Sequence, residues 1–311
     1  MNPRVVAVVA LVGSAATVPL LVATTWAGLE GLIVPIFLLT LVVAEAARRC
    51  AASFPRLVLL LALVGAVLAV VSILTGWLNG FSDEPYTTPA YAALGWNLYT
   101  QPIHIVYLQY GVAHTETSFY VYLPLLTYLQ VPGLDYRWVA LGAWGAALCL
   151  LRRRPFAAAG FSAAWIPLLA ANGQNDFVPL LALTVALALP TLRNRFWAEV
   201  VALAVKQPAN IVVFFYHLLR REYLRAVAAI AITVAILAPF LYLAPGAVVC
   251  HVLVGDPGTT CAGHPWTFFV FKRNYWLYPA WAAVVFGPAV GASWRRWRPG
   301  TAPAAPERAP T

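Results

Sequence analysis

The sequence predicts an all-α membrane protein, a helical bundle of about eight full spans plus two elements that enter the bilayer and return. The first observation is composition: 62% of the residues are apolar and 10% are charged, whereas soluble domains have about half and a quarter. The second is that several apolar stretches approach the length of about 20 residues that crosses a bilayer. The third is that the basic residues form short clusters between these stretches, as in cytoplasmic loops.

The charge distribution predicts a topology. The net charge of +9 does not indicate nucleic-acid binding, because the arginines are divided among separate clusters. The clusters contain Arg48, Arg49 and Arg56; Arg152, Arg153 and Arg154; Arg193 and Arg195; Arg220, Arg221 and Arg225; and Arg295, Arg296 and Arg298. If all are inside, the opposite loops hold Asp83, Glu84, Glu116, Asp135, Asp176 and Asp256. We therefore expect a multi-pass cell-membrane protein with cytoplasmic termini and acidic loops outside.

The expected spans follow from the apolar stretches. They are residues 5–26, 31–47, 57–78, 136–151, 156–171, 177–192, 224–243 and 275–294. The first stretch resembles a signal peptide, but it exceeds the usual apolar region of about 7–15 residues and a second stretch follows it. We expect one transmembrane domain over residues 1–298. The Pro- and Ala-rich residues 299–311 are expected to form a disordered cytoplasmic tail.

Two apolar stretches do not fit as full crossings. Residues 119–131 would form a helix of about 20 Å, too short to span, so we expect this segment to dip in and return. Residues 196–219 have a basic cluster at each end, which favours a hairpin of two half-helices broken at Lys206-Gln207-Pro208. Broken helices at membrane depth are tolerated where they line an enclosed or water-filled cavity. The hairpin therefore predicts a cavity with Lys206 at its tip.

Three groups of polar residues are candidates for a site. Lys206, an ammonium in an apolar stretch, needs an anionic partner; this is either Glu199 (or the lysine extends to the interface) or a lipid phosphate. Asp83 and Glu84 begin the long outer loop 79–118; they are either retained for function or a solvated pair at a helix end. In the outer turn 172–176, Gln174 and Asp176 either bind a ligand or serve the turn, with Asp176 capping the next helix.

These motifs together resemble the GT-C superfamily of membrane glycosyltransferases, most closely its polyprenyl-phosphate-mannose-dependent enzymes. The resemblance rests on FSDEPYTTPAY (81–91), YVYLPLL (120–126), NGQND (172–176) and the Lys-Gln-Pro break (206–208). It implies transfer of a sugar, such as the hexose mannose, from a polyprenyl-phosphate-linked donor to a hydroxyl of a lipid or glycan acceptor. The transfer would invert the anomeric carbon and occur on the extracytoplasmic side.

The resemblance also implies roles for individual residues. Asp83 would be the general base, which is worth about 10²–10⁴-fold in rate, with Glu84 as its neighbour or substitute. Lys206 would offset the charge of the leaving phosphate. The remaining expected substrate contacts are hydrogen bonds from Gln207 and Gln174, a contact from Asp176, stacking by Tyr86 and Tyr122, and orientation of the acceptor by His104. Interfacial belts are also rich in tyrosine, which is the alternative for these two aromatics.

No cofactor is expected. A divalent metal could be held by His104, His114 and Glu116 with Asp83, although their spacing matches no strong zinc motif. In the outer loop 246–274, Cys250 and Cys261 are expected to form a disulfide; a zinc clip with His251 and His264 is the alternative.

Two other classes of function remain open. A transporter or lipid flippase would explain a broken hairpin and a buried lysine, but it predicts corresponding breaks in two halves of the chain, which the sequence does not show. A non-catalytic membrane subunit would explain the short chain and leave Asp83 and Lys206 without a role.

Overall fold

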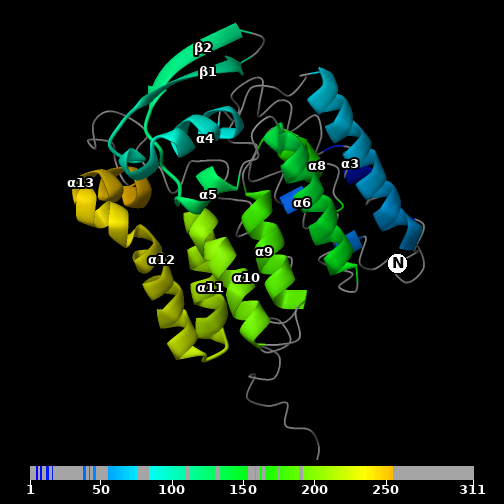
Figure 1. Ribbon diagram of the computed structural model, residues 1–311. Helices are drawn as coiled ribbons and strands as arrows, with labels where there is room; N and C mark the ends of the chain where they lie inside the picture. Colours follow the sequence, from blue (N-terminus) through cyan, green and yellow to red (C-terminus); the bar gives the residue numbers. More distant parts are fainter. Residues whose placement is uncertain are drawn as a thin grey trace, which may run out of the picture.

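The computed structural model (Figure 1) describes seven continuous segments and thirteen isolated positions. The segments are residues 55–75, 84–109, 112–129, 134–152, 165–171, 176–188 and 192–254. The isolated positions are 5, 8, 12, 13, 16, 38, 39, 42, 45, 46, 158, 162 and 173. The expected spans 5–26, 31–47 and 275–294 therefore lie largely or wholly outside the described residues.

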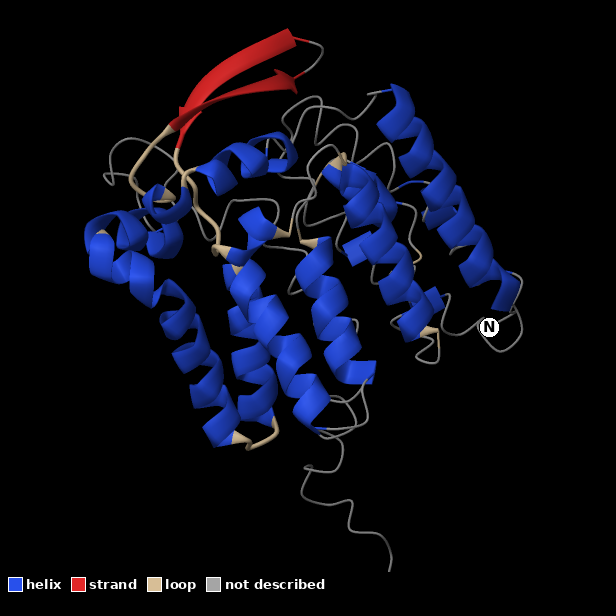
Figure 2. Ribbon diagram, in the orientation of Figure 1, coloured by secondary structure: helices blue, strands red, loops and turns tan. Residues whose placement is uncertain are grey.

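The described part of the chain is mostly helical, with one β-hairpin (Figure 2). Its helices are α3 (Pro55–Thr75), α4 (Glu84–Ala93), α5 (Leu125–Tyr128), α6 (Tyr136–Leu151), α8 (Trp165–Ala171), α9 (Phe177–Ala188), α10 (Leu192–Val205), α11 (Gln207–Leu219), α12 (Tyr223–Leu243) and α13 (Pro245–Val248). A 3₁₀ turn (Gly95–Asn97) follows α4, and a π-helical turn (Val249–Val254) follows α13. The strands are β1 (Ile103–Gln109) and β2 (Val112–Ser118).

The longer helices form a bundle around an apolar core. Helices α9, α10, α11 and α12 lie side by side, α6 packs against α8 and α9, and α3 packs against α8 (Figure 1). The core is built largely from small and aliphatic side chains such as Ala140, Leu168, Leu180 and Ala202, all of them buried. At one end of this bundle lie α4, α5 and the β-hairpin (Figure 1).

One described helix, α12, is long and apolar enough to cross a membrane by itself. Helix α6 has the bounds expected from the sequence, and α3 differs from its expected span by a few residues. Helices α9 and α8 fall within the spans expected over 177–192 and 156–171; residues 189–191 and most of 156–164 lie outside the described residues. Large apolar side chains stand exposed on α12, including Leu224 at 84% and Tyr242 at 87%, as on a helix that faces lipid.

The expected interruption at Lys206 is present. Helix α10 ends at Val205 and α11 begins at Gln207, while Lys206 has an extended backbone with φ −150° and ψ 137°. Pro208 lies in the first turn of α11, where its missing N–H removes no helical hydrogen bond. The helices pack against each other, and each is about 20 Å long. Lys206 is therefore at the tip of a helical hairpin.

The expectation for residues 119–131 was wrong in its secondary structure. Among its described residues, 119–129, only Leu125–Tyr128 form a helical turn, and those before Pro124 lack regular structure. Proline disfavours helical backbone in the residue before it. Tyrosine hydroxyls then satisfy the backbone: Tyr99 donates to the carbonyl of Tyr122 at 2.8 Å, and Tyr120 donates to that of Leu123 at 3.0 Å. The segment is a buried, hydrogen-bonded strap.

The all-α expectation also missed the β-hairpin. Strands β1 and β2 pair antiparallel, with Ile103 opposite Ser118 and Gln109 opposite Val112. The sequences IHIVYLQ and VAHTETS are rich in the β-branched and aromatic residues that favour strands. Their polar content had indicated a loop.

The turn between α11 and α12 forms a Schellman motif. The N–H of Arg221 donates to the carbonyl of Leu218 at 3.0 Å, and the N–H of Glu222 donates to that of His217 at 2.9 Å. This motif places its last residue but one in the left-handed region, where glycine is favoured. Arg221 occupies that position with φ 61°. The turn therefore holds an arginine in a conformation that disfavours any side chain.

Candidate functional site

A buried ion pair joins the hairpin tip to α9. The Nζ atom of Lys206 lies 2.7 Å from Oδ1 of Asp176, and both residues have an exposed fraction of 0%. Asp176 immediately precedes α9, and its backbone carbonyl accepts the N–H of Leu180 at 3.0 Å. Two sequence-predicted residues, 30 positions apart, thus meet inside the protein.

Burying this ion pair has a free-energy cost that well-packed apolar side chains in its place would not have. Removing the two charges from water costs several kcal/mol per ion. Their mutual attraction returns about the same amount, so a buried ion pair contributes little to net stability. The alternative pairing of Lys206 with Glu199 is wrong, because Lys206 pairs with Asp176 and Glu199 bonds to His217.

Tyr122 covers the ammonium of this pair. The Nζ atom of Lys206 lies 5.0 Å from the centre of the Tyr122 ring, within range of a cation–π interaction worth about 0.5–2 kcal/mol. The hydroxyl of Tyr99 holds the backbone of Tyr122 from the other side. Burial, and secondarily the nearby Tyr128, raises the pKa of Tyr99, so its phenol remains protonated and able to donate. Tyr122 was predicted to contact substrate, and the structure brings its ring to Lys206.

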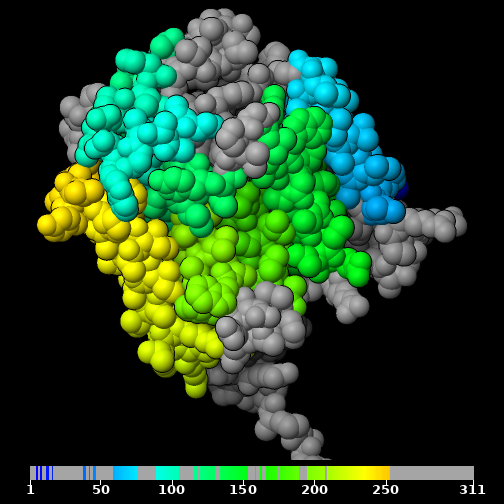
Figure 3. All heavy atoms as spheres, viewed as in Figure 1, coloured from blue at the N-terminus to red at the C-terminus, as the bar shows by residue number. Residues whose placement is uncertain are grey.

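A chain of aromatic contacts connects this pair to α4. The ring centres of Tyr91 and Tyr120 are 4.9 Å apart, and those of Tyr120 and Tyr122 are 5.9 Å apart. Tyr91 lies on α4, about 10 Å along the helix axis from its first residue, Glu84. Helix α4 packs against α5, the helical turn of the strap, and the cyan spheres of α4 adjoin the green spheres of this region in the space-filling view (Figure 3). The acidic motif therefore lies at the start of a helix, α4, that is connected to Lys206 through Tyr91, Tyr120 and Tyr122.

The other predicted site residues are placed as follows. Asp83 and Gln174 lie outside the described residues. Glu84 and Tyr86 lie in the first turn of α4, and Gln207 is the first residue of α11. These five assignments remain predictions.

His104 lies on the β-hairpin. Its Nδ1 atom is 2.9 Å from the hydroxyl oxygen of Thr117, on the facing strand. By register, position 104 shares a face with positions 115 and 117, whereas positions 114 and 116 fall on the other face. The metal site considered for His104, His114 and Glu116 with Asp83 remains a prediction. Among the residues that the structure describes, no group of three or more metal-binding side chains occurs.

The structure describes one of the two cysteines expected to form the disulfide of the outer loop 246–274. Cys250 is disulfide-bonded and Cys149 is free, while the expected partner, Cys261, lies outside the described residues. His251, considered as a zinc ligand, stacks on Phe119 with ring centres 4.5 Å apart and planes 8° apart.

A second polar cluster, at the base of the hairpin, was not predicted. His217 lies between two carboxylates: its Nε2 atom is 3.0 Å from Glu199 and its Nδ1 atom is 2.7 Å from Glu222. Glu222 also accepts hydrogen bonds from Arg220 and Arg225. Burial alone would raise the pKa of Glu222, but the hydrogen bonds from His217 and Arg220 outweigh it and lower that pKa. The sequence signal was a histidine and a glutamate within the two apolar arms.

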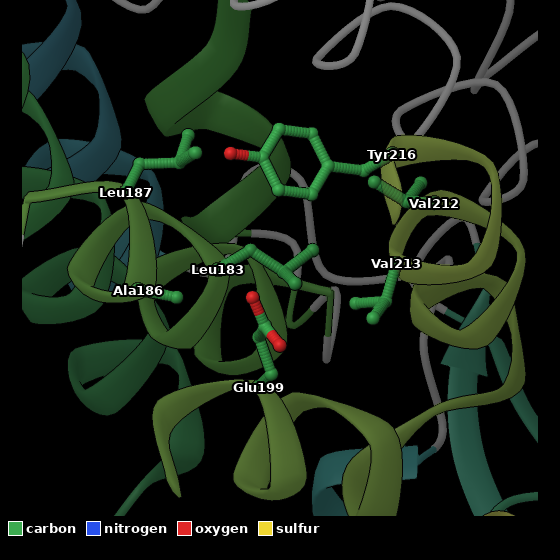
Figure 4. A pocket seen from close by; sticks show the side chains of 7 residues that line it. All are labelled: Leu183, Ala186, Leu187, Glu199, Val212, Val213 and Tyr216. Carbon is green, nitrogen blue, oxygen red and sulfur yellow. The ribbon is translucent and has the colours of Figure 1, made fainter. Parts of the chain in front are cut away.

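A small pocket adjoins this cluster (Figure 4). It lies between α9, α10 and α11 and has a cavity volume of about 20 Å³, enough for about one water molecule. Aliphatic side chains form most of its wall, and the Glu199 carboxylate and the Tyr216 hydroxyl point into it (Figure 4). The aliphatic residues are Leu183, Ala186, Leu187, Val212 and Val213.

Comparison with known proteins gives no match: no protein-family model, no curated protein and no solved structure corresponds to this chain. Its function is therefore argued from its own residues.

Proposed function

We propose that the chain is an integral membrane glycosyltransferase. It moves a sugar, such as a hexose of the mannose type, from a polyprenyl-phosphate-linked donor to a hydroxyl of a lipid or glycan acceptor. The buried pair of Lys206 and Asp176 at the tip of a broken helix, covered by Tyr122, carries this proposal. The motifs that contain these residues resemble those of the GT-C superfamily, which supports the same proposal.

The chemistry of the pair suits a phosphate ligand. A lysine ammonium has three N–H donors, and Lys206, which holds Asp176, is proposed to bind a phosphate oxygen of the donor as well. Positive charge placed where negative charge develops is the main electrostatic requirement of a leaving phosphate. Asp176 holds the ammonium in place at 2.7 Å. Gln174 and Gln207 adjoin these two residues in sequence and are proposed to donate further hydrogen bonds to the donor.

The transfer step then follows. Asp83, with Glu84 as neighbour or substitute, takes the proton of the acceptor hydroxyl, and the freed oxygen attacks the anomeric carbon from the face opposite the phosphate. The bond between that carbon and the phosphate oxygen breaks with its electron pair on the oxygen. Lys206 offsets the charge, and the anomeric carbon is inverted. Tyr86, Tyr122 and His104 are proposed to position the sugar and the acceptor.

The cellular setting is part of the same proposal. Helix α12 is a candidate span, and the disulfide of Cys250 is the kind of bond that persists in oxidising compartments. The first supports association with a membrane, and the second supports a site on the oxidising side; several passes and cytoplasmic termini are proposed from the arginine clusters. No cofactor is proposed.

The test is sugar transfer in membranes that contain the protein. The wild type should move labelled sugar from a polyprenyl-phosphate donor to lipid or glycan acceptors, and Asp83→Asn should lower the rate by about 10²–10⁴-fold. Asp256→Asn, which alters an acid of another predicted outer loop, is the matched control and should retain activity. Movement of intact lipid without sugar transfer would indicate a flippase, a function that the broken helices α10 and α11 would also suit. Equal transfer by wild type and Asp83→Asn would refute the assignment of the base.

A further inference from the structure

The base of the helical hairpin holds a histidine between two acids. His217, near the end of α11, is 1% exposed. Its two ring nitrogens face Glu199 of α10 at 3.0 Å and Glu222, just before α12, at 2.7 Å. One imidazole on α11 thus contacts residues from two other parts of the chain.

This geometry requires a proton beyond those of a neutral imidazole and two carboxylates. A neutral imidazole has one N–H and one lone pair, whereas an imidazolium donates from both nitrogens. If the ring were neutral, one contact would set a lone pair against a carboxylate oxygen at hydrogen-bond distance. We propose that Glu199, His217 and Glu222 form a proton-binding site, in which the imidazolium of His217 ties α10 to α11 and to the start of α12.

The charges around the site favour this placement. Arg220 and Arg225 bond to Glu222 at 3.1 and 3.4 Å, which keeps that acid ionised. On the other side, Glu199 is 8% exposed, and His217 is the cation bonded to it. The ring of Tyr216 also packs against His217, with centres 5.2 Å apart. From α9, the side chains that meet this region across the pocket are Leu183, Ala186 and Leu187.

Loss of the proton would leave the Glu199 carboxylate buried against a neutral ring. A buried charge that loses its partner is strongly destabilising, so the α10–α11 contact should weaken when the site deprotonates. The pocket of Figure 4 adjoins the Glu199 carboxylate and offers a route for proton exchange. The site is separate from the Lys206–Asp176 pair, so the inference is independent of glycosyl transfer.

The first test is thermal unfolding of the detergent-solubilised full chain between pH 6 and 9. A histidine that is charged more readily in the folded state stabilises below its unfolded pKa, about 6.5, and this stability is lost as the pH rises. The unfolding equilibrium constant of the wild type should therefore increase up to about tenfold per pH unit over part of this range. His217→Gln should remove this dependence. His251→Gln, which changes another buried histidine, is the control and should keep it.

A second measurement covers the case in which His217→Gln does not fold. In the ¹⁵N NMR spectrum of the histidine-labelled wild type at pH 7.5, one imidazole should show both nitrogens protonated. That signal should shift in Glu222→Gln, whose side chain is 29% exposed in the wild type and whose replacement is mild. A pH dependence that persists in His217→Gln, or an NMR spectrum with only neutral rings at pH 7.5, would overturn the proposal.

Discussion

Lys206 and Asp176 form an ion pair with no exposure to solvent, at the point where the α10–α11 hairpin meets the start of α9. The lysine occupies the break between two helices, and the aspartate ends the turn that precedes a third. The pair thus fixes one end of three helices. The proposed site requires this arrangement, since its cation must stay charged away from water.

The pair predicts a specific pattern of stability. Lys206→Met and Asp176→Leu should each lower the free energy of unfolding by about 3–5 kcal/mol, because each leaves one buried charge without its partner. The double variant should be more stable than either single variant. Chemical unfolding in detergent measures all three. Additive losses in the double variant would show that the two side chains do not interact.

Tyr122 is expected to stabilise the charged form of Lys206 through its ring face. Tyr122→Leu should lower the free energy of unfolding by about 0.5–2 kcal/mol more than Tyr122→Phe does, because phenylalanine retains an aromatic face for the cation. The same unfolding measurement applies. The difference should vanish in a Lys206→Met background, and a difference that survives there would show that packing rather than the ammonium is responsible.

Arg221 is expected to be replaceable by glycine with a gain in stability. At φ 61° an L-residue is disfavoured by about 1–2 kcal/mol, and glycine is not. Arg221→Gly should therefore raise the midpoint of thermal unfolding. Arg221→Ala is the matched control, since it removes the same side-chain contacts but keeps the strained backbone. Equal midpoints for the two variants would contradict the explanation.

Asp135 caps α6 and is expected to contribute a pH-dependent part of the stability. Its carboxylate accepts the backbone N–H of Arg137 at 2.9 Å and pairs with that guanidinium at 2.6 Å. Burial alone would raise the pKa of Asp135, but the bonds from Arg137 outweigh it and lower that pKa below the ordinary 3.8. A carboxylate with a lowered pKa stabilises above its ordinary value, and the effect is lost as the pH falls through the folded value.

The cap prediction has two arms. Asp135→Ala should lower stability at neutral pH by about 0.5–2 kcal/mol, and Asp135→Asn, which can still cap the helix, should lower it less. The deficit of Asp135→Asn should shrink below about pH 3.8. Thermal unfolding at pH 7 and pH 3 checks this. A deficit of equal size at both pH values would show that the charge of Asp135 has no part.

Some of this structure could be predicted from sequence because it depends on local chemistry. The bounds of α6 follow from its apolar length, and the break at Lys206 follows from a charged residue and a proline between basic clusters. The strap was mistaken for a helix because apolar length alone does not reveal that tyrosine hydroxyls would satisfy its backbone. The β-hairpin was missed because its strands are partly polar.

The candidate site, too, could be predicted only in part from the sequence. Lys206, Asp176 and Tyr122 were each selected from sequence, but their convergence depends on packing among segments far apart in the chain. Glu199 seemed the natural partner of Lys206 because it is near in sequence. In the structure, Glu199 pairs with His217 instead. This pairing joins two helices, and no local sequence pattern indicates it.

The most direct measurement is sugar transfer from a polyprenyl-phosphate donor by the Lys206→Met/Asp176→Leu double variant. This variant has no buried charge left unpaired, so its stability and activity can be compared separately with those of the wild type. We expect it to fold and to lose about 10²–10³-fold in transfer rate, because the developing phosphate charge has lost its cation. A double variant that transfers sugar at the wild-type rate would show that the ion pair is structural and that the proposed site is elsewhere.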